Sequence, residues 1–171
     1  ENMAWKYQGI VEKMCLAAIS AGARIMAVYS EDDFGVEVKG DDSPITRADR
    51  LADNVIGKIL KQNFPDIPIV SEESNCDLTA TMGAIYFLVD PLDGTKEFIK
   101  KTGEFTVNIA VILNGKAELG VVYVPVTKEL YYRNLDGHSY LERDVNDFES
   151  RGERTQISCR TADMDNLSVV R

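Results

Sequence analysis

The chain has 171 residues, of which 44% are hydrophobic and 27% are charged, and its formal net charge is −9. This composition is typical of a folded globular domain and excludes an intrinsically disordered chain. The absence of a basic stripe disfavours binding to a nucleic-acid polymer, and no apolar run is long enough to span a bilayer.

The first half of the sequence predicts two amphipathic helices. Apolar residues recur with helical spacing over residues 7–29, and again after Thr46, a residue type that is favoured at helix N-caps. The second helix is expected to end before Pro65. Between the helices, residues 31–44 are rich in turn formers around a short alternating piece, which predicts a small hairpin or an exposed loop.

The second half predicts strands. Residues 67–73 (IPIVSEE) indicate a short strand, and residues 84–90 (AIYFLVD) form a continuous apolar run that predicts a strand covered on both faces. A short helix is expected at residues 98–101. An antiparallel meander with turns at Asn114-Gly115 and Asp136-Gly137 is expected over residues 104–113, 117–126, 129–134 and 138–143. The predicted fold class is therefore α+β, with two helices packed on a mostly antiparallel sheet.

The sequence also bears on the compartment. Cys15, Cys76 and Cys159 have no paired spacing, which favours reduced thiols rather than a disulfide framework. No signal-peptide pattern is present. We therefore expect a cytoplasmic protein.

Acidic residues follow two apolar strands of the predicted sheet. Glu72 and Glu73 end one strand, Asp90 ends the next, and Asp93 is expected in the turn behind it. If the two strands are neighbours, the carboxylates share one rim and raise each other's pKa values. Divalent cations relieve such repulsion, and oxygen ligands suit Mg²⁺, Mn²⁺ or Ca²⁺. Soft metals are disfavoured because no Cys or His that suits them lies at this motif.

The Gly94-Thr95 pair adds an anion-binding feature. Gly94 lets the backbone approach a ligand closely, and the free amides at the start of a helix-like run favour an anion such as phosphate. Water activated by a bound metal ion could then attack phosphorus in line. The sequence therefore indicates phosphoester hydrolysis, although DPLDGT alone also matches a simple β-turn with an exposed Asp-Gly.

Other polar residues have simpler interpretations. Thr46-x-x-Asp49 before an apolar stripe matches a capping box, which would explain Asp49 without any catalytic role. Lys39 could reach an anion, but a solvated hairpin lysine is the simpler reading. His138, the only histidine, follows a turn and is expected at the surface.

Four segments together resemble the inositol monophosphatase superfamily of Mg²⁺-dependent, lithium-sensitive phosphatases. They are SEES (71–74), DPLDGTKEF (90–98), GEFTVNIAVI (103–112) and GVVYVPV (120–126). SPITRAD and the run KEFIKKTGEFTVNIA are closer to the 3′(2′),5′-bisphosphate nucleotidase (CysQ-type) branch than to the inositol phosphatases. The resemblance extends from about residue 6 to the end of the sequence.

The resemblance implies metal ligands within these motifs. An activating ion would bind Glu72, Asp90 and the backbone carbonyl of Leu92, and a second ion would bind Asp90 and Asp93. Glu73 would act behind the ligands or assist a third ion. The implied cofactor is Mg²⁺, as two or three ions, with Mn²⁺ as a substitute and with Li⁺ and Ca²⁺ as inhibitors.

The resemblance also implies the chemistry. Asp49 and Thr95 would orient the nucleophilic water, and the scissile phosphate would lie against Leu92, Asp93, Gly94 and Thr95. The expected reaction is removal of the 3′-phosphate from adenosine 3′,5′-bisphosphate, in a setting such as sulfate assimilation. An inositol or other sugar phosphatase on the same scaffold is the alternative.

One family feature is not matched. Members of the superfamily carry a further metal-binding aspartate in a Trp-Asp motif of a C-terminal α/β domain, whereas the only tryptophan here is Trp5. We therefore expect residues 1–160 to form the metal-binding α+β phosphatase domain and residues 161–171 to begin a second domain. That domain would be supplied in cis or by another chain. A non-catalytic cation-binding module is the remaining alternative.

Overall fold

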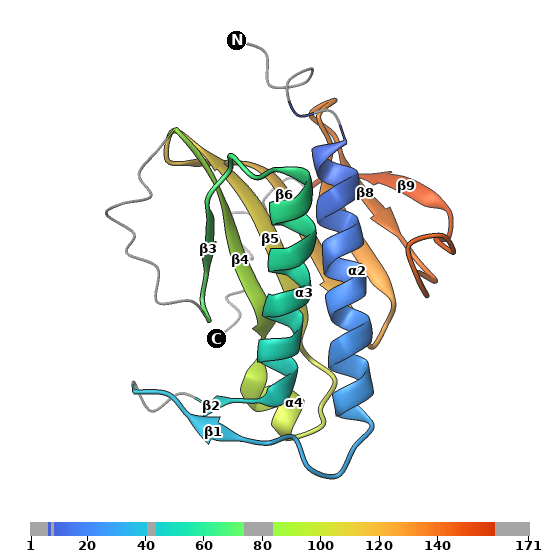
Figure 1. Ribbon diagram of the computed structural model, residues 1–171. Helices are drawn as coiled ribbons and strands as arrows, with labels where there is room; N and C mark the ends of the chain where they lie inside the picture. The colour runs from blue at the N-terminus through green and yellow to red at the C-terminus, as the bar shows by residue number, and fades with distance from the viewer. Residues whose placement is uncertain (1–6, 8, 41–43, 74–83, 160–171) are drawn as a thin grey trace, which may run out of the picture.

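The computed structural model describes residues 7, 9–40, 44–73 and 84–159. Two helices, α2 and α3, lie side by side on one face of a seven-stranded sheet, and a small hairpin and the short helix α4 lie together at one end (Figure 1). The helices and strands are α2 (Ile10–Tyr29), β1 (Glu37–Val38), β2 (Pro44–Ile45), α3 (Arg47–Asn63), β3 (Ile69–Ser71), β4 (Ile85–Asp93), α4 (Thr95–Ile99), β5 (Thr106–Leu113), β6 (Lys116–Val124), β7 (Glu129–Arg133), β8 (Ser139–Glu142) and β9 (Arg154–Ile157). No described helix combines the length and apolarity needed to cross a membrane.

The sheet confirms the α+β prediction. Its strands follow the order β3-β4-β5-β6-β7-β8-β9, and every neighbouring pair is antiparallel except β3 and β4. The parallel pair aligns Ser71 with Val89, so the C-terminal ends of both strands lie at the same end of the sheet. Strand β9 was not predicted, because three of its four side chains are exposed and its sequence has no apolar alternation.

The two predicted helices are present. Thr46 is the N-cap of α3, with a complete capping box to Asp49, and the buried face of the helix includes Ala48, Ala52, Ile56 and Leu60 at a spacing of four residues. The hairpin expected in residues 31–44 is confirmed as the antiparallel pair of β1 and β2, in which Glu37 lies opposite Ile45.

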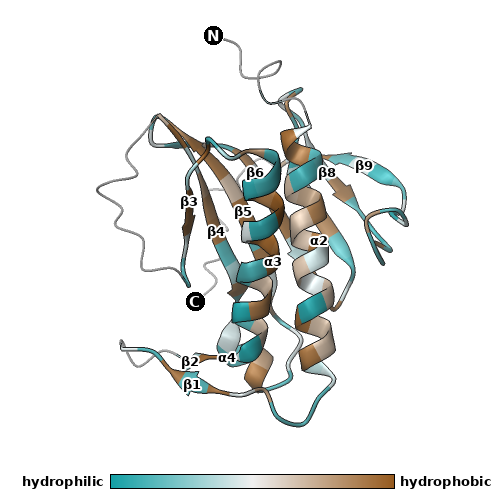
Figure 2. Ribbon diagram, in the orientation of Figure 1, coloured by the Kyte–Doolittle hydropathy of each residue, from teal (hydrophilic) through white to brown (hydrophobic). Residues whose placement is uncertain are grey.

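Among the described residues, the helices cover one face of the sheet, and the expectation that β4 is buried on both faces is wrong. Phe87 and Val89 point to the helix side and are buried, whereas Leu88 is 43% exposed and Val122 of β6 is 37% exposed. A mainly apolar hollow of about 540 Å³ lies over these exposed side chains. The hydropathy colouring shows the brown strands behind the mixed colours of the helices (Figure 2).

An aromatic cluster holds α4 in place. The ring of Phe98, which is fully buried, lies 5.1–5.3 Å from the rings of Tyr29, Phe34 and Phe105. These residues come from the end of α2, the following loop and the segment before β5. Aromatic contacts at this spacing add to the burial energy of each ring. The cluster therefore fixes the turn that precedes α4.

Gly22 and Gly57 predict opposite effects of substitution by alanine. A Cβ at Gly22 of α2 would lie 2.4 Å from the ring of Tyr123, which is buried and hydrogen-bonded to Val145, whereas a Cβ at Gly57 of α3 meets nothing within 4 Å. Gly22→Ala should destabilise the fold by about 1–3 kcal/mol through overpacking. Gly57→Ala should stabilise it by about 0.5–1 kcal/mol through helix propensity. Urea unfolding measures both, and equal effects would contradict the close packing of α2 on β6.

Candidate active site

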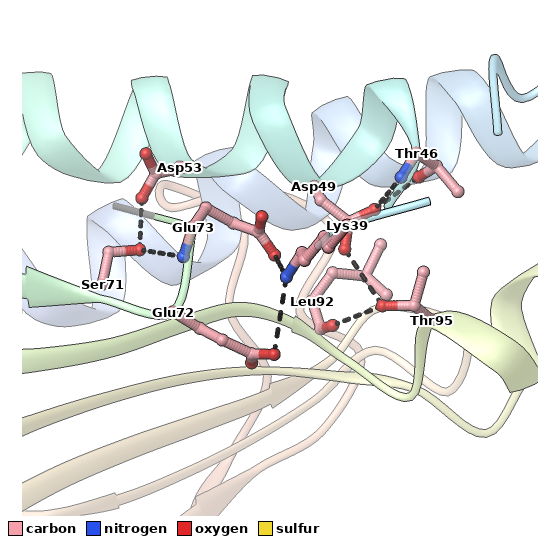
Figure 3. Close-up of polar contacts among 9 residues, drawn as sticks. All are labelled: Lys39, Thr46, Asp49, Asp53, Ser71, Glu72, Glu73, Leu92 and Thr95. Atoms are coloured by element: carbon pink, nitrogen blue, oxygen red, sulfur yellow. Dashed lines mark hydrogen bonds and ion pairs between the residues drawn. The ribbon is translucent and has the colours of Figure 1, made fainter. Parts of the chain in front are cut away.

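Asp49 is buried in the first turn of α3, and its two carboxylate oxygens have different partners (Figure 3). Oδ2 accepts hydrogen bonds from the backbone N–H of Thr46 at 2.8 Å and from its hydroxyl at 2.5 Å. Oδ1 accepts one from the hydroxyl of Thr95 at 3.0 Å. The capping role and the contact with the predicted site, which the sequence presented as alternatives, therefore coexist in one side chain.

The turn between β4 and α4 brings Thr95 to this carboxylate. The Thr95 hydroxyl lies 3.2 Å from the carbonyl oxygen of Leu92, and Gly94 has a φ of 96°. A Cβ at Gly94 would approach the carbonyl oxygen of Glu104 to 2.7 Å. Only glycine fits this left-handed conformation and close approach without strain.

The parallel pairing of β3 and β4 brings the predicted acidic residues together. The backbone N–H of Glu72 donates to the carbonyl of Val89 at 3.0 Å, which places Glu72 beside Asp90. Asp93 was expected in a turn, but this expectation is wrong. Strand β4 continues to Asp93, with a register shift after Asp90. In a regular strand, residues three apart point to opposite faces. The register shift between Asp90 and Asp93 allows both side chains to line the same pocket.

Glu72, Asp90 and Asp93 all line one pocket of about 260 Å³. Residues 92–95 and Lys96 also line it, so the acidic side chains and the glycine-threonine turn share a single space. Asp49 lies behind Thr95 and reaches this pocket through the threonine hydroxyl.

The acidic residues repel each other in this arrangement. Burial, together with the charges of Glu72 and Asp93 and a hydrogen bond with Glu72, raises the pKa of Asp90 to about 7. Burial disfavours the charged carboxylate, and the negative charges nearby make its ionisation harder still. The rim therefore has the electrostatics of a site for a cation.

The donor chemistry fits a hard divalent ion, because carboxylates and a backbone carbonyl are the oxygen ligands that Mg²⁺ takes. The side chains are not gathered around one point, since no three Asp, Glu, His or Cys side chains of the described residues lie close enough to form a metal-binding group. An ion bound here would have to draw the carboxylates of Glu72, Asp90 and Asp93 together.

Lys39 was misjudged as a solvated residue. Its side chain is 22% exposed, and its Nζ lies 2.7 Å from Oε1 of Glu73 and 3.6 Å from Oε1 of Glu72. Burial disfavours the charged lysine, but the hydrogen bond and the charge of Glu73 outweigh it, so the pKa of Lys39 is raised. For Glu73 the effect of burial is larger than that of Lys39, so the pKa of this carboxyl group is raised. Nothing in the local hairpin sequence indicates this long-range ion pair.

Asn108 and Thr106 of β5 are further residues that the sequence analysis missed. The Asn108 amide donates to Oδ2 of Asp93 at 3.0 Å, and the Thr106 hydroxyl donates to Oδ1 of Asn108 at 3.1 Å. The available signal was the pair of polar residues at alternate positions of an otherwise apolar strand.

Other predicted residues lie away from the pocket. His138 is exposed, as expected, with its Nδ1 at 3.2 Å from the amide of Gln156. Cys15 and Cys159 are free thiols. Three further predictions, on Trp5, on Cys76 and on the start of a second domain at residues 161–171, lie outside the described residues.

Comparison with known proteins matches this chain to curated relatives. The chain is 46% identical over 155 residues to the 3′(2′),5′-bisphosphate nucleotidase CysQ of Salmonella typhimurium, which covers 90% of this chain and 60% of the relative. It is 48% identical to the protein of that name from Escherichia coli K12, with the same coverage. The chain therefore spans about three fifths of the length of these relatives.

The comparison with solved structures agrees with the sequence matches. The crystal structure of CysQ from Bacteroides thetaiotaomicron, described as a bacterial member of the inositol monophosphatase family, superposes with a TM-score of 0.77 at 37% identity. The match covers 92% of this chain and 60% of that one. The model of the inositol monophosphatase family matches residues 7–169. Because this family model spans almost the whole chain and the fold agrees, the chain belongs to the inositol monophosphatase family.

Proposed function

We propose that this protein is a Mg²⁺-dependent phosphomonoesterase that removes the 3′-phosphate of adenosine 3′,5′-bisphosphate. The observation that carries the proposal is the Thr95 hydroxyl, held by the buried Asp49 at the edge of a pocket lined by Glu72, Asp90 and Asp93. The names of the relatives support the choice of a bisphosphate nucleotide as substrate.

The acidic side chains are the proposed metal ligands. Glu72, Asp90 and the carbonyl of Leu92 would hold one ion, and Asp90 and Asp93 would hold another. When bound, the ions would activate the attacking water and offset the charge on the phosphate. Asn108 keeps the carboxylate of Asp93 oriented through its amide hydrogen bond.

Thr95 and Asp49 are the proposed groups that position and deprotonate the attacking water. Because the Thr95 hydroxyl donates its proton toward Asp49, its lone pairs are free to accept a hydrogen bond from water in the pocket. A proton from that water could pass through Thr95 to Oδ1 of Asp49. Oδ2 accepts the two hydrogen bonds of the helix cap, which hold the carboxylate in an orientation that keeps Oδ1 directed at Thr95.

Residues 92–95 are the proposed phosphate-binding segment. Gly94 allows the backbone to bend tightly beside the pocket, and the first amides of α4 have no partner within the helix. Lys96 lines the same pocket and supplies a positive charge that favours an anionic substrate.

The test is phosphate release from adenosine 3′,5′-bisphosphate with Mg²⁺. Asp93→Asn should lower the rate by about a hundredfold or more, because a charged metal ligand is lost. Asp66→Asn, which changes an exposed carboxyl after α3, is the matched control and should leave the rate unchanged.

The same assay separates the alternatives. Faster release from inositol 1-phosphate than from the nucleotide would favour a sugar phosphatase on this scaffold. Mg²⁺ binding without release from any phosphomonoester would favour a non-catalytic cation-binding module. Either result would refute the proposed activity.

The two threonines that contact Asp49 should separate catalysis from stability. Thr95→Ala removes the contact at Oδ1 and should lower kcat by about a hundredfold, with Thr95→Ser retaining most activity. Thr46→Ala removes the cap hydroxyl at Oδ2 and should cost about 1 kcal/mol of stability while kcat changes little. Steady-state kinetics and urea unfolding measure the two effects. Equal losses of kcat in Thr46→Ala and Thr95→Ala would contradict the division of roles.

The raised pKa of Asp90 predicts opposite pH effects on stability and on metal binding. Its pKa in the folded state, about 7, lies above the ordinary value of 3.8 for an aspartate. The stability that protonated Asp90 contributes is therefore present below pH 4 and is lost as the pH rises through 7. Asp90→Asn should raise the melting temperature of the metal-free protein at pH 8 more than at pH 5.

Mg²⁺ binding requires the ionised form of Asp90. The apparent affinity of wild-type protein for Mg²⁺ should therefore fall by up to about tenfold for each pH unit below 7. Calorimetric titration at pH 6 and pH 8 checks this, with Asp66→Asn as the control. A pH-independent affinity would show that Asp90 does not ligate the ion.

A further inference from the structure

The adjacent residues Glu72 and Glu73 present their carboxylates to different surroundings. The Glu72 side chain is 56% exposed and lines the pocket, whereas the Glu73 side chain is only 7% exposed. Ser71 connects Glu73 to α3: its hydroxyl donates to Asp53 at 2.5 Å and lies 3.4 Å from the backbone N–H of Glu73 (Figure 3). The position of Glu73 is therefore fixed on its helix side and not by the pocket.

Lys39 supplies the positive charge that the buried Glu73 needs. A carboxylate removed from water is costly unless it is paired with a cation. Nζ of Lys39 lies 2.7 Å from Glu73 and 3.6 Å from Glu72, and among the residues that the structure describes no other cation forms an ion pair with either glutamate. Lys39 therefore competes directly with any divalent ion for the carboxylate of Glu73.

We propose that Lys39 is a positioning residue that neutralises Glu73 and thereby confines divalent ions to the pocket lined by Glu72, Asp90 and Asp93. Glu73 is then the fixed partner of a lysine and not a ligand of a third ion. Glu72 keeps its exposed carboxylate for the metal, and the more distant Lys39 competes for it only weakly. This inference rests on the proposed metal dependence, but its consequences are measured by ion binding alone.

The same contact ties the hairpin to the site. Lys39 directly follows β1, and β2 leads directly into Thr46 and the start of α3. The hairpin makes a second, exposed ion pair between Glu37 and Arg50, and this pair does not include Glu72 or Glu73. Arg50 therefore provides a matched control: a cation that also holds the hairpin but contacts none of the rim residues.

The test is binding of Mn²⁺, followed by the electron paramagnetic resonance signal of the free ion, without substrate. Lys39→Met should increase the affinity by about tenfold or add a bound ion, because Glu73 becomes available. Lys39→Arg should behave like wild type, because the charge is restored. Arg50→Met should also match wild type. Unchanged Mn²⁺ binding in folded Lys39→Met would overturn the proposal.

Glu73→Gln gives a prediction of opposite sign. The freed Lys39 would then pair with Glu72, so the affinity for Mn²⁺ should fall. This variant decides the question even if Lys39→Met does not fold, and a rise in affinity would overturn the proposal. In the double variant Lys39→Met/Glu73→Gln, the affinity should return to within about twofold of wild type, as expected for two residues that act as a pair.

Phosphate release by the wild-type protein is measured in parallel. If phosphate is released but Mn²⁺ affinity is unchanged in both Lys39→Met and Glu73→Gln, the role of Lys39 is refuted and the proposed function stands. Mn²⁺ binding that responds as predicted, without any release, would refute the proposed function and support the role of Lys39. A wild-type protein that binds no Mn²⁺ would refute both.

Discussion

The carboxylate of Asp49 is the contact on which the candidate site depends. One oxygen completes the N-terminal cap of α3, and the other holds the hydroxyl of Thr95, forty-six residues further along the chain. The helix that covers the sheet and the turn that lines the pocket are therefore fixed by the same group. A helix cap is usually a local feature, but here the capping carboxylate also orients a side chain in the pocket, so one group serves both the helix and the site.

The acidic rim shows the opposite balance between stability and chemistry. Glu72, Asp90 and Asp93 are held near one another by strand pairing, and the result is a carboxyl group, that of Asp90, that resists ionisation. Lys39 relieves the repulsion mainly at Glu73, because its contact with Glu72 is longer. Proteins commonly retain such unfavourable charge where function requires it. The rest of the domain has to supply the stability that this edge of the sheet lacks, and the buried helix faces and the aromatic cluster around Phe98 do so.

Much of this fold was predictable from the sequence, because the two helices carry strong periodic patterns and the meander is punctuated by clear turns. The clustering of Glu72 and Asp90 was also predictable, because each follows an apolar strand and the two strands lie side by side. The ion pair of Lys39 was not, because thirty-four residues separate it from Glu73 and a lysine in a polar hairpin looks solvated. The open face of β4 was also misread: an apolar run shows that a strand has two apolar faces, but not that both are covered. The extension of β4 to Asp93 depends on a local irregularity that residue composition does not encode.

The single parallel pair in the sheet has a consequence for how variation in this protein should be read. Side chains alternate between the two faces of a strand, so a slip of β3 by one residue along β4 would exchange the side chain of Glu72 with that of Glu73. The polypeptide would remain folded, with most of its sheet intact, yet the wrong glutamate would border the pocket. Substitutions at Ile69 or Val70, which do not line the pocket of Glu72, Asp90 and Asp93, would therefore impair the proposed activity by misaligning an edge strand. Such an effect would not mean that these residues take part in the reaction.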